Sequence, residues 1–593
     1  MAEIGLQHIA LSFSGGGYRA AAFTLGCVSY LNRTSYGGAP LFTRVKFISS
    51  ASGGSITNLV LCGMLREGRS FEEVYKHLVE QMQGCQLVDA VFDVLNDEAA
   101  WAARPDKTRN FINAFSMVYD RELFHGKTFG LLWETPAGDG FVVDETCVNA
   151  TEFNNGLNFR FGTRGVLGNQ FLHFKSQSRD VVGKIKLADI LACSSCFTAG
   201  FEPVVFPGDF AWQEGGDGVT KEQLSAAMVA NNRYNSTVLD EQQATAEIGF
   251  MDGGIDDNQG IYAFLLADGR AKGYEYDLYF PCDVSSNYLK NPFRYAPERT
   301  APLLQRSLAD WKEEGRKLRT KYQWWVVVAL LVSVGLFLLP PVRLIGAVLL
   351  GMSLSAILLP LVVFRILVRR VQGLVSTILP PAEPGHPQGM YRLVFKKHMG
   401  GFFKMPLSRL IQLLEVRGAS VGLLATTIFL KKIRRASYEL LYDERPKDNI
   451  AMTAVYQLST KNALQLDIDL AGEPWDHEMQ TIPDGSQLLD TFLLPSEVLR
   501  GVIDNATAMG TTLWFDAEDQ GKKCLESLLA AGQATMCFNL LRVSYRFGNA
   551  DEDWLELRRQ LAADWKRFKE EPYWMYNEYL GLAGLQGYAK VGL

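Results

Sequence analysis

Histidine and cysteine are scarce in this chain of 593 residues, with seven and nine copies respectively. There is no HExxH motif, and Cys193 and Cys196 have no second cysteine pair at zinc-finger spacing. We therefore expect no metal site and no cofactor, and small buried side chains explain these two cysteines best.

Charge of neither sign dominates: 59 Lys and Arg stand against 65 Asp and Glu, a net charge of −6. This balance excludes a generally basic protein that binds nucleic acid. No repeat of solenoid spacing occurs. The first residues, MAEIGLQHIALSF, show no secretory signal, so a reducing cytosol is expected. With 48% apolar and 21% charged residues, the chain is a folded protein of about two to four domains.

Long apolar runs are confined to one segment. Residues 324–339 and 344–364 carry no charge and are separated by a short turn that contains two prolines. The second run is long enough to cross a bilayer, and the first reaches that length with its neighbours, since about 20 residues are needed. We expect a transmembrane helical hairpin. The alternative is a buried hairpin in a soluble core.

Cations flank this hairpin on both sides, while the turn carries only Arg343. The flanking residues are Arg316, Lys317, Arg319, Lys321, Arg365, Arg369 and Arg370. By the positive-inside rule both flanks are cytoplasmic, which predicts a membrane protein with two spanning helices. Trp324 and Trp325 stand where an interfacial aromatic belt is expected.

The first 300 residues alternate short β-rich runs with helical patterns, which predicts an α/β fold. Strands are expected at 9–14, 45–50, 141–151, 158–161, 246–251 and 274–281, and a short helix at 187–193. Residues 207–245 are polar and rich in turn formers, which indicates a flexible insertion or lid.

The C-terminal part begins with a linker at 380–389. An amphipathic stretch at 406–442 follows and carries a basic cluster. Such a helix lies on anionic headgroups or packs one face and solvates the other; both readings stay open. Residues 451–458 are a candidate strand that returns to the first sheet, and 522–546 is helical.

Three short motifs in the first 260 residues bear on chemistry. Gly15, Gly16 and Gly17 lie between a strand and a helix, where backbone N–H groups point at an anion. Ser52 follows the next strand, and with Gly54 two residues later it fits the sharp strand-to-helix turn that exposes a nucleophile. Each motif taken alone is also explained as a tight turn.

The third motif is Asp252, which ends a strand-like run and is followed by two glycines. Ligands of α/β folds bind at the carboxyl ends of strands, although turn chemistry accounts for this motif equally simply. Ser50 is a poorer nucleophile than Ser52 because no glycine flanks it, and Ser55 lies inside the helix.

In this order, the loop and elbow (IALSFSGGGYRAAAF and FISSASGGSI) and the aspartate motif (GFMDGGIDDN) resemble the patatin-like phospholipase family. The resemblance covers about residues 5–290. It implies a three-layer α/β/α catalytic domain with Ser52 as nucleophile and Asp252 as base. It also implies an oxyanion hole formed by the N–H groups of Gly15, Gly16, Gly17 and Gly53.

Arg19 is expected either to orient a lipid phosphate or to brace the loop against a carboxylate. The sequence departs from the family at Ser50, which replaces the first elbow glycine, and at 258–260, where the family often has Asn-Asn-Pro. A histidine that completes an ordinary triad after the acid is hard to find, since only His386, His398 and His477 follow Asp252.

These readings predict a catalytic domain at 1–300, the membrane hairpin at 301–375, and a mainly helical region at 376–593 that packs back on the catalytic domain. The expected function is hydrolysis of fatty acyl esters of phospholipids or lysophospholipids at a membrane. A neutral lipid or thioester hydrolase is the alternative enzyme, and a membrane scaffold or effector gated by a partner is the alternative of another class. Membrane lipids, a regulatory protein or a second copy of the chain are the expected partners, and nucleic acid is not.

Overall fold

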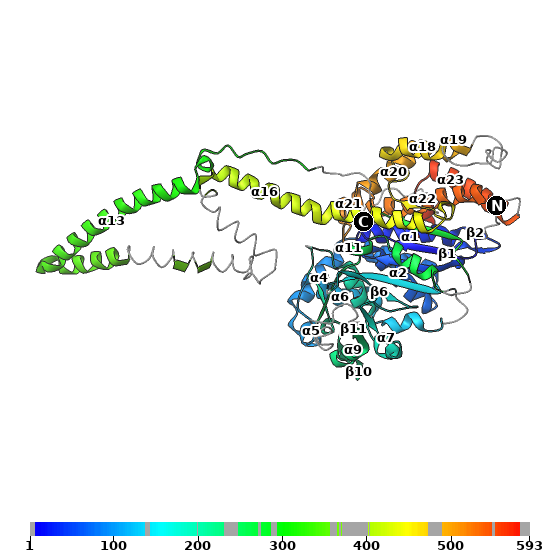
Figure 1. Cartoon of the computed structure of the whole chain (residues 1–593), viewed down its shortest axis with the longest axis horizontal. Helices are drawn as coiled ribbons and strands as arrows, with labels where there is room; N and C mark the ends of the chain where they lie inside the picture. Colours follow the sequence, from blue (N-terminus) through cyan, green and yellow to red (C-terminus); the bar gives the residue numbers. More distant parts are fainter. Residues whose placement is uncertain are drawn as a thin grey trace. The chain divides into compact units, whose positions relative to one another are not determined.

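The structure is a computed structural model that describes residues 6–136, 141, 143–153, 155–198, 200–230, 247–270, 274–285, 293–355, 365–366, 369–370, 401, 404–471, 489–547 and 552–581. The chain divides into two compact units (Figure 1). The first unit contains residues 1–290 together with 426–593, and the second contains residues 291–425. The predicted linker at 380–389 and the hairpin residues 356–364 lie outside the described residues.

The first unit is a mixed α/β fold around an eight-stranded, mostly parallel sheet, as the sequence predicts. The strand order is β14-β13-β1-β4-β5-β12-β8, with β6 paired to β5 outside this path. The strands are β1 (Ile9–Phe13), β4 (Val45–Ala51), β5 (Glu145–Glu152), β6 (Leu157–Gly162), β8 (Val204–Phe206), β12 (Ile248–Asp252), β13 (Leu278–Asp283) and β14 (Thr453–Ala454). Neighbours from β14 to β5 are parallel, whereas β12, β8 and β6 run antiparallel to their partners.

Alternating side chains of the central strands enter two separate hydrophobic clusters. Leu11, Ile48 and Val148 belong to the large core that includes residues of α1 (Tyr18–Arg33) and α2 (Gly53–Arg66). Their sequence neighbours Ala10, Phe47 and Cys147 pack with α12 (Ile261–Asp268). Helices therefore cover both faces of the sheet (Figure 1).

The C-terminal residues complete the first unit. Helix α22 (Cys524–Phe547) packs along α1, and residues of α20 (Glu497–Ala508) and α23 (Glu552–Glu570) enter the same core. The short strand β14 extends the sheet next to β13, which agrees with the strand expected near 451–458. The domain boundaries proposed from the sequence remain predictions.

Two glycines set the distance between α1 and α22. A Cβ atom on Gly26 would lie 2.2 Å from the Leu529 carbonyl oxygen, and a Cβ on Gly532 would lie 2.2 Å from the Phe23 carbonyl oxygen. Both obstacles are backbone atoms, which cannot turn aside as a side chain does. Only glycine at these two positions allows the two helices to approach so closely.

Several expected elements appear close to their predicted bounds. β5 and β6 form the predicted antiparallel hairpin, and α8 (Leu187–Ser195) is the predicted short helix. The polar stretch 207–245 is only partly described. Its described part contains regular elements, among them β9 (Trp212–Glu214), β10 (Asp217–Val219) and α9 (Lys221–Ala227). Residues 231–246 lie outside the described residues.

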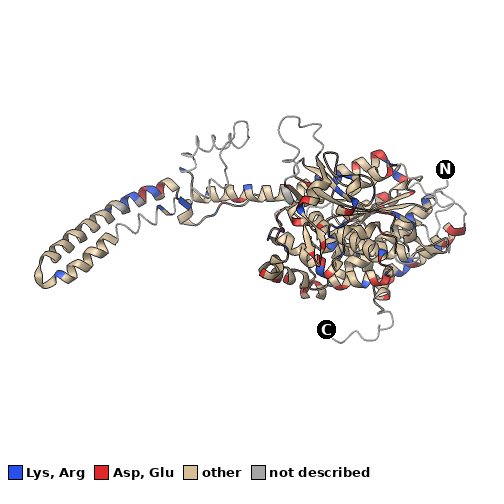
Figure 2. Cartoon of the chain, turned by 90° about the horizontal axis from the view of Figure 1, so that it is seen from below, with Lys and Arg blue, Asp and Glu red and all other residues tan. Residues whose placement is uncertain are grey.

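The second unit contains α13 (Leu308–Leu338), which begins at a capping box between Ser307 and Asp310. The apolar helix Pro340–Ser355 follows directly. Charged residues gather near the start of α13, and the rest of that helix is tan in Figure 2. Helix α16 (Leu407–Leu423) belongs to the same unit.

Two helices of the described chain are long and apolar enough to cross a membrane. In the apolar window of Thr320–Leu338, 6% of the residues are buried. In that of Cys524–Arg546 the share is 94%, and this helix belongs to the core of the first unit. In the segment 320–355 the fully buried residues are Ser333, Gly346 and Ser353, all of them small. Most large apolar side chains of this segment, such as Trp325, are exposed, and the others are partly exposed.

We predict that Gly532→Ala destabilises the first unit by about 1–3 kcal/mol, because the added methyl group meets backbone atoms of α1. Gly501→Ala in α20 is the matched control, since nothing lies within 4 Å of a Cβ at that position. This control is expected to be neutral or stabilising by about 0.5–1 kcal/mol. Urea unfolding of both variants measures the difference, and equal stabilities would contradict the proposed helix contact.

Candidate active site

Strand β5 brings Ser52 and Asp252 to the same place. One edge of β5 is occupied by β6 from Cys147 to Glu152. On the other edge β4 pairs up to Asn149, which lies opposite Ala51, and β12 pairs from Ala150, which lies opposite Asp252. The two strands approach from opposite directions and end at adjacent residues of β5. Ser52, the residue after Ala51, is therefore placed beside Asp252.

Ser52 occupies the strained turn that the sequence predicts. Its φ of 50° and ψ of −126° lie in a region that non-glycine residues rarely adopt, and α2 starts at the next residue. The turn leaves no room for larger neighbours. A Cβ on Gly53 would lie 2.0 Å from the Gly17 carbonyl oxygen, and a Cβ on Gly54 would lie 2.7 Å from Phe13. Ser52 is 8% exposed.

Asp252 is 3% exposed, and this burial raises the pKa of its carboxyl group to about 6. The Ser52 hydroxyl and the backbone N–H of Gly254 act in the opposite direction by hydrogen bonding to the carboxylate. The Gly254 N–H donates to Oδ1 at 2.7 Å. Oδ2 has no well-aligned partner among the described residues, so the contact with Ser52 falls short of a standard hydrogen bond.

The C-terminal end of α8 holds both catalytic candidates. The Ser52 N–H donates to Ser194 Oγ at 2.9 Å, and that hydroxyl donates to the Asn149 carbonyl oxygen at 2.7 Å. The carbonyl oxygen of Ser194 accepts the Gly253 N–H, and that of Cys196 accepts the Asp252 N–H. Ser194 is thus a positioning residue that joins the serine turn to the aspartate turn.

The glycine-rich loop lies beside the serine. A Cβ on Gly15 would be 3.0 Å from Ser52 Cβ, but the Gly15 N–H donates to the Asn258 carbonyl oxygen at 2.9 Å. Among the described residues no acceptor is found for the N–H groups of Gly16, Gly17 and Gly53. Of the four predicted oxyanion donors, these three have their hydrogens available, while Gly15 provides space and links the loop to Asn258.

Arg19 is buried below the loop rather than at its surface. Its guanidinium donates to the Val284 carbonyl oxygen, and burial lowers its pKa to about 10 against the opposing effect of Asp283. The hydrogen-bond partner is thus a backbone carbonyl rather than the expected carboxylate, and both expected roles of Arg19 stay predictions.

A segment far away in sequence lies on the same loop. The Thr512 carbonyl oxygen accepts the Tyr18 N–H at 2.7 Å, and a Cβ on Gly17 would lie 2.2 Å from that oxygen. Phe515 exchanges two backbone hydrogen bonds with Gly84 a few residues later. The C-terminal region therefore anchors the start of α1, next to the available amides.

Local motifs indicate Ser52, Asp252 and the glycines, but they do not reveal Ser194 or Thr512. Ser194 lies in the run of small residues at 192–197, which carries no chemical signature of its own. Thr512 is separated from the glycine loop by almost 500 residues, so no spacing rule connects the two.

Comparisons with known proteins find only distant likenesses. No protein-family model matches the chain, and no curated protein matches it. Two solved structures of human GIVD cytosolic phospholipase A2 are similar, one of them in complex with a methyl γ-linolenyl fluorophosphonate inhibitor and terbium chloride. The match to that complex has 14% identity and a TM-score of 0.22, and it covers 26% of this chain and 23% of the phospholipase chain.

The other human structure has 11% identity and a TM-score of 0.28, and the match covers 46% of this chain and 42% of that one. VipD from Legionella pneumophila has 10% identity and a TM-score of 0.22, covering 100% of this chain and 93% of that one. The chain thus spans less than half the length of either human structure.

Proposed function

We propose that the chain is a membrane-anchored serine acyl hydrolase of the patatin-like type, which cleaves fatty acyl esters of phospholipids or lysophospholipids. The observation that carries this proposal is the meeting of Ser52, in a strained strand-to-helix turn, with the buried carboxylate of Asp252. The order of the three motifs and the helices on both faces of the sheet support a patatin-like α/β/α domain.

In this mechanism Ser52 Oγ attacks the acyl carbonyl carbon while Asp252 accepts the hydroxyl proton. The N–H groups of Gly16, Gly17 and Gly53 donate to the oxyanion, each contributing on the order of 3 kcal/mol. The proton then passes to the departing alkoxide, which leaves as the alcohol. Water, deprotonated by Asp252, hydrolyses the acyl-serine, releases the fatty acid and restores Ser52.

The elevated pKa of Asp252 suits this role. A carboxylate of ordinary pKa is a weak base towards an alcohol, and general bases work best when their pKa lies near the working pH. Burial moves Asp252 in that direction while leaving it ionised at neutral pH. The neighbouring amides supply the rest of the stabilisation without a histidine.

The second unit supplies the membrane anchor in this proposal. Its hairpin buries small residues and exposes large apolar ones, the reverse of a soluble core. Small residues at the contact between two helices are typical of packed membrane helices. In this chain a Cβ on Gly346 would lie 2.3 Å from the Phe337 backbone nitrogen, so only glycine fits there. By the positive-inside rule, the cations on both flanks support a cytoplasmic position for these flanks and for the catalytic unit in this proposal.

The nearly closed site favours a gated form of the same activity. With Ser52 only 8% exposed, a long acyl chain reaches the hydroxyl after neighbouring residues move. The segment around Thr512 contacts the glycine loop, although it is almost 500 residues away in sequence. A lipid surface, a regulatory protein or a second copy of the chain are the partners that would favour the open form. A neutral lipid or thioester substrate is distinguished by assaying triacylglycerol and acyl-CoA beside phospholipid.

We expect Ser52→Ala and Asp252→Asn each to lower the release of fatty acid from detergent-dispersed phospholipid by about a thousandfold or more. Ser195→Ala and Asp256→Asn are the matched controls, because they make the same chemical changes nearby at more exposed positions. Product analysis by mass spectrometry measures the rates. Turnover of either dyad variant at the level of its control would rule out the proposed dyad.

The pKa of Asp252 predicts the pH dependence of the reaction. The carboxylate acts as base only when ionised, so activity is full above about pH 7 and falls tenfold per pH unit below about pH 6. The rate of covalent labelling of Ser52 by a fluorophosphonate, followed from pH 4.5 to 8, gives the midpoint. A midpoint near the ordinary aspartate value of about 4 would show that burial of Asp252 is not maintained in the working enzyme.

The double substitution Val327→Arg and Leu331→Arg tests the membrane anchor. Both side chains are exposed near the middle of the span Thr320–Leu338, where each arginine costs about 2.5–3.5 kcal/mol of insertion. We expect the variant to be released from membranes by alkaline carbonate while the wild type stays in the pellet. The control is Leu464→Arg with Ile468→Arg, two exposed residues at the same spacing in α18 (Ala463–Ala471). Release of the wild type, or retention of the variant, would contradict the anchor.

A further inference from the structure

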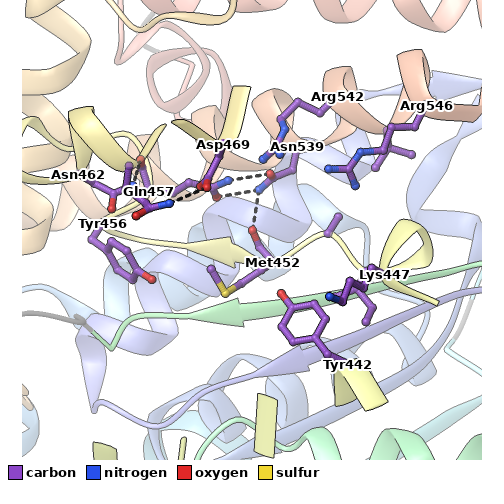
Figure 3. Close-up of a pocket in the computed structure, with 14 residues that line it drawn as sticks. Tyr442, Lys447, Met452, Tyr456, Gln457, Asn462, Asp469, Asn539, Arg542 and Arg546 are labelled. Carbon is purple, nitrogen blue, oxygen red and sulfur yellow. Dashed lines mark hydrogen bonds between the residues drawn. The ribbon is translucent and has the colours of Figure 1, made fainter. Parts of the chain in front are cut away.

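A cavity of about 330 Å³ lies in the first unit, lined by none of the residues of the Ser52 site (Figure 3). It is enclosed by the end of α17 (Phe429–Glu444), the turn at Lys447–Asn449, the chain around β14, and helices α18 and α22. Its size is at the lower end of the range of small-molecule sites. It is therefore large enough for a small organic ligand.

Three cationic side chains line this cavity. Arg542 and Arg546 are four residues apart on α22, so both project from the same face of the helix, and Lys447 faces them from the opposite wall (Figure 3). Among the lining residues that the structure describes, Asp469 is the only acid. On these described walls three cationic side chains stand against one carboxylate, so the cavity suits an anion.

Burial lowers the pKa of both arginines. Burial and the neighbouring Arg546 lower the pKa of Arg542 to about 10, despite the opposing effects of Asp469 and Tyr442. Burial also lowers the pKa of Arg546, against Asp448 and Tyr442. An anion bound between the two guanidinium groups would favour their charged forms and so raise both pKa values.

The floor of the cavity is a closed set of amide hydrogen bonds. Gln457 and Asn539 exchange hydrogen bonds of 3.0 Å in both directions, and Asn539 also donates to the Met452 carbonyl oxygen at 3.1 Å. Asn462 donates to the Gln457 carbonyl oxygen at 2.8 Å. Asn539 lies one turn before Arg542 on α22, so this network holds the arginine-bearing face in place.

We propose that this cavity binds a small molecule bearing a phosphate group, with Arg542, Arg546 and Lys447 as its ligands. The planar guanidinium forks of two arginines match the oxygens of a phosphate, and lysine adds a point charge. The cavity exceeds the space of a bare phosphate, which favours a phosphomonoester whose organic part lies against Tyr442 and Tyr456. Such a group occurs both in soluble metabolites and as a lipid headgroup.

Isothermal titration calorimetry of the full chain in detergent tests the site with two soluble probes, inorganic phosphate and glycerol 3-phosphate. Vesicles of phosphatidylcholine with and without phosphatidic acid are the lipid probes. Arg542→Gln and Arg546→Gln should each weaken binding about ten- to a hundredfold, the effect of losing one charged hydrogen bond. Arg559→Gln, an exposed arginine on the neighbouring helix α23, is the matched control and should bind as the wild type does.

The probes distinguish the source of the ligand. Binding of glycerol 3-phosphate that depends on the two arginines supports a soluble phosphomonoester. Arginine-dependent binding only to phosphatidic acid vesicles supports a lipid headgroup. Lys447→Gln, at a less buried position, gives the same readout if an arginine variant fails to fold. The proposal is overturned if no phosphate probe binds the wild type, or if the arginine, lysine and control variants all bind equally.

Discussion

The geometry of the candidate active site depends on one edge of strand β5, where a parallel and an antiparallel strand meet end to end. Because β6 pairs with Cys147–Glu152 on the other edge, β4 and β12 share this one, and their last residues fall on neighbouring positions of β5. Both strands end here, and the chain turns out of the sheet after Ala51 and after Asp252. The candidate nucleophile Ser52 and the candidate base Asp252, which are 200 residues apart in sequence, are brought together by the hydrogen-bond register of the sheet itself.

Everything close to this junction is built to keep it narrow. Backbone atoms fill the space next to Gly53, Gly54 and Gly253, so the turns that carry the serine and the aspartate cannot shift apart by changes of side-chain rotamer. Ser194 links the two turns, because its hydroxyl accepts the Ser52 N–H and its carbonyl oxygen accepts the Gly253 N–H. Close contacts with the glycine loop and with β1, β5 and α8 thus maintain the strained backbone at Ser52.

Much of this arrangement is predictable from local sequence, because strand-to-helix turns and strand ends have short signatures. Ser52, Asp252 and the glycine loop carry such signatures, and the hairpin carries the compositional signature of a membrane span. The separation of Gly15 from the other three glycines is not predictable, since it depends on the position of the Asn258 carbonyl oxygen. The same holds for the burial of Arg19.

The contribution of the C-terminal region is the least predictable part, because it depends on contacts between residues several hundred positions apart. Helix α22 reads as a spanning helix by length and hydropathy, yet its burial against α1 makes it a core element. The pair Gly26 and Gly532 that permits this packing is invisible without the fold. The cationic cavity is formed in the same way, from a turn, a strand end and two helices that meet only in three dimensions.

The hydrogen bond between Tyr18 and Thr512 has a consequence for the order of events during synthesis. The start of α1 is among the first parts of the chain to leave the ribosome, whereas Thr512 emerges only after most of the protein has been translated. Ser52 and Asp252 are therefore synthesised well before Thr512, which fixes the start of α1 beside the glycine loop. Under the function proposed above, lipid cleavage begins only when translation is nearly complete, after the proposed membrane span has been synthesised.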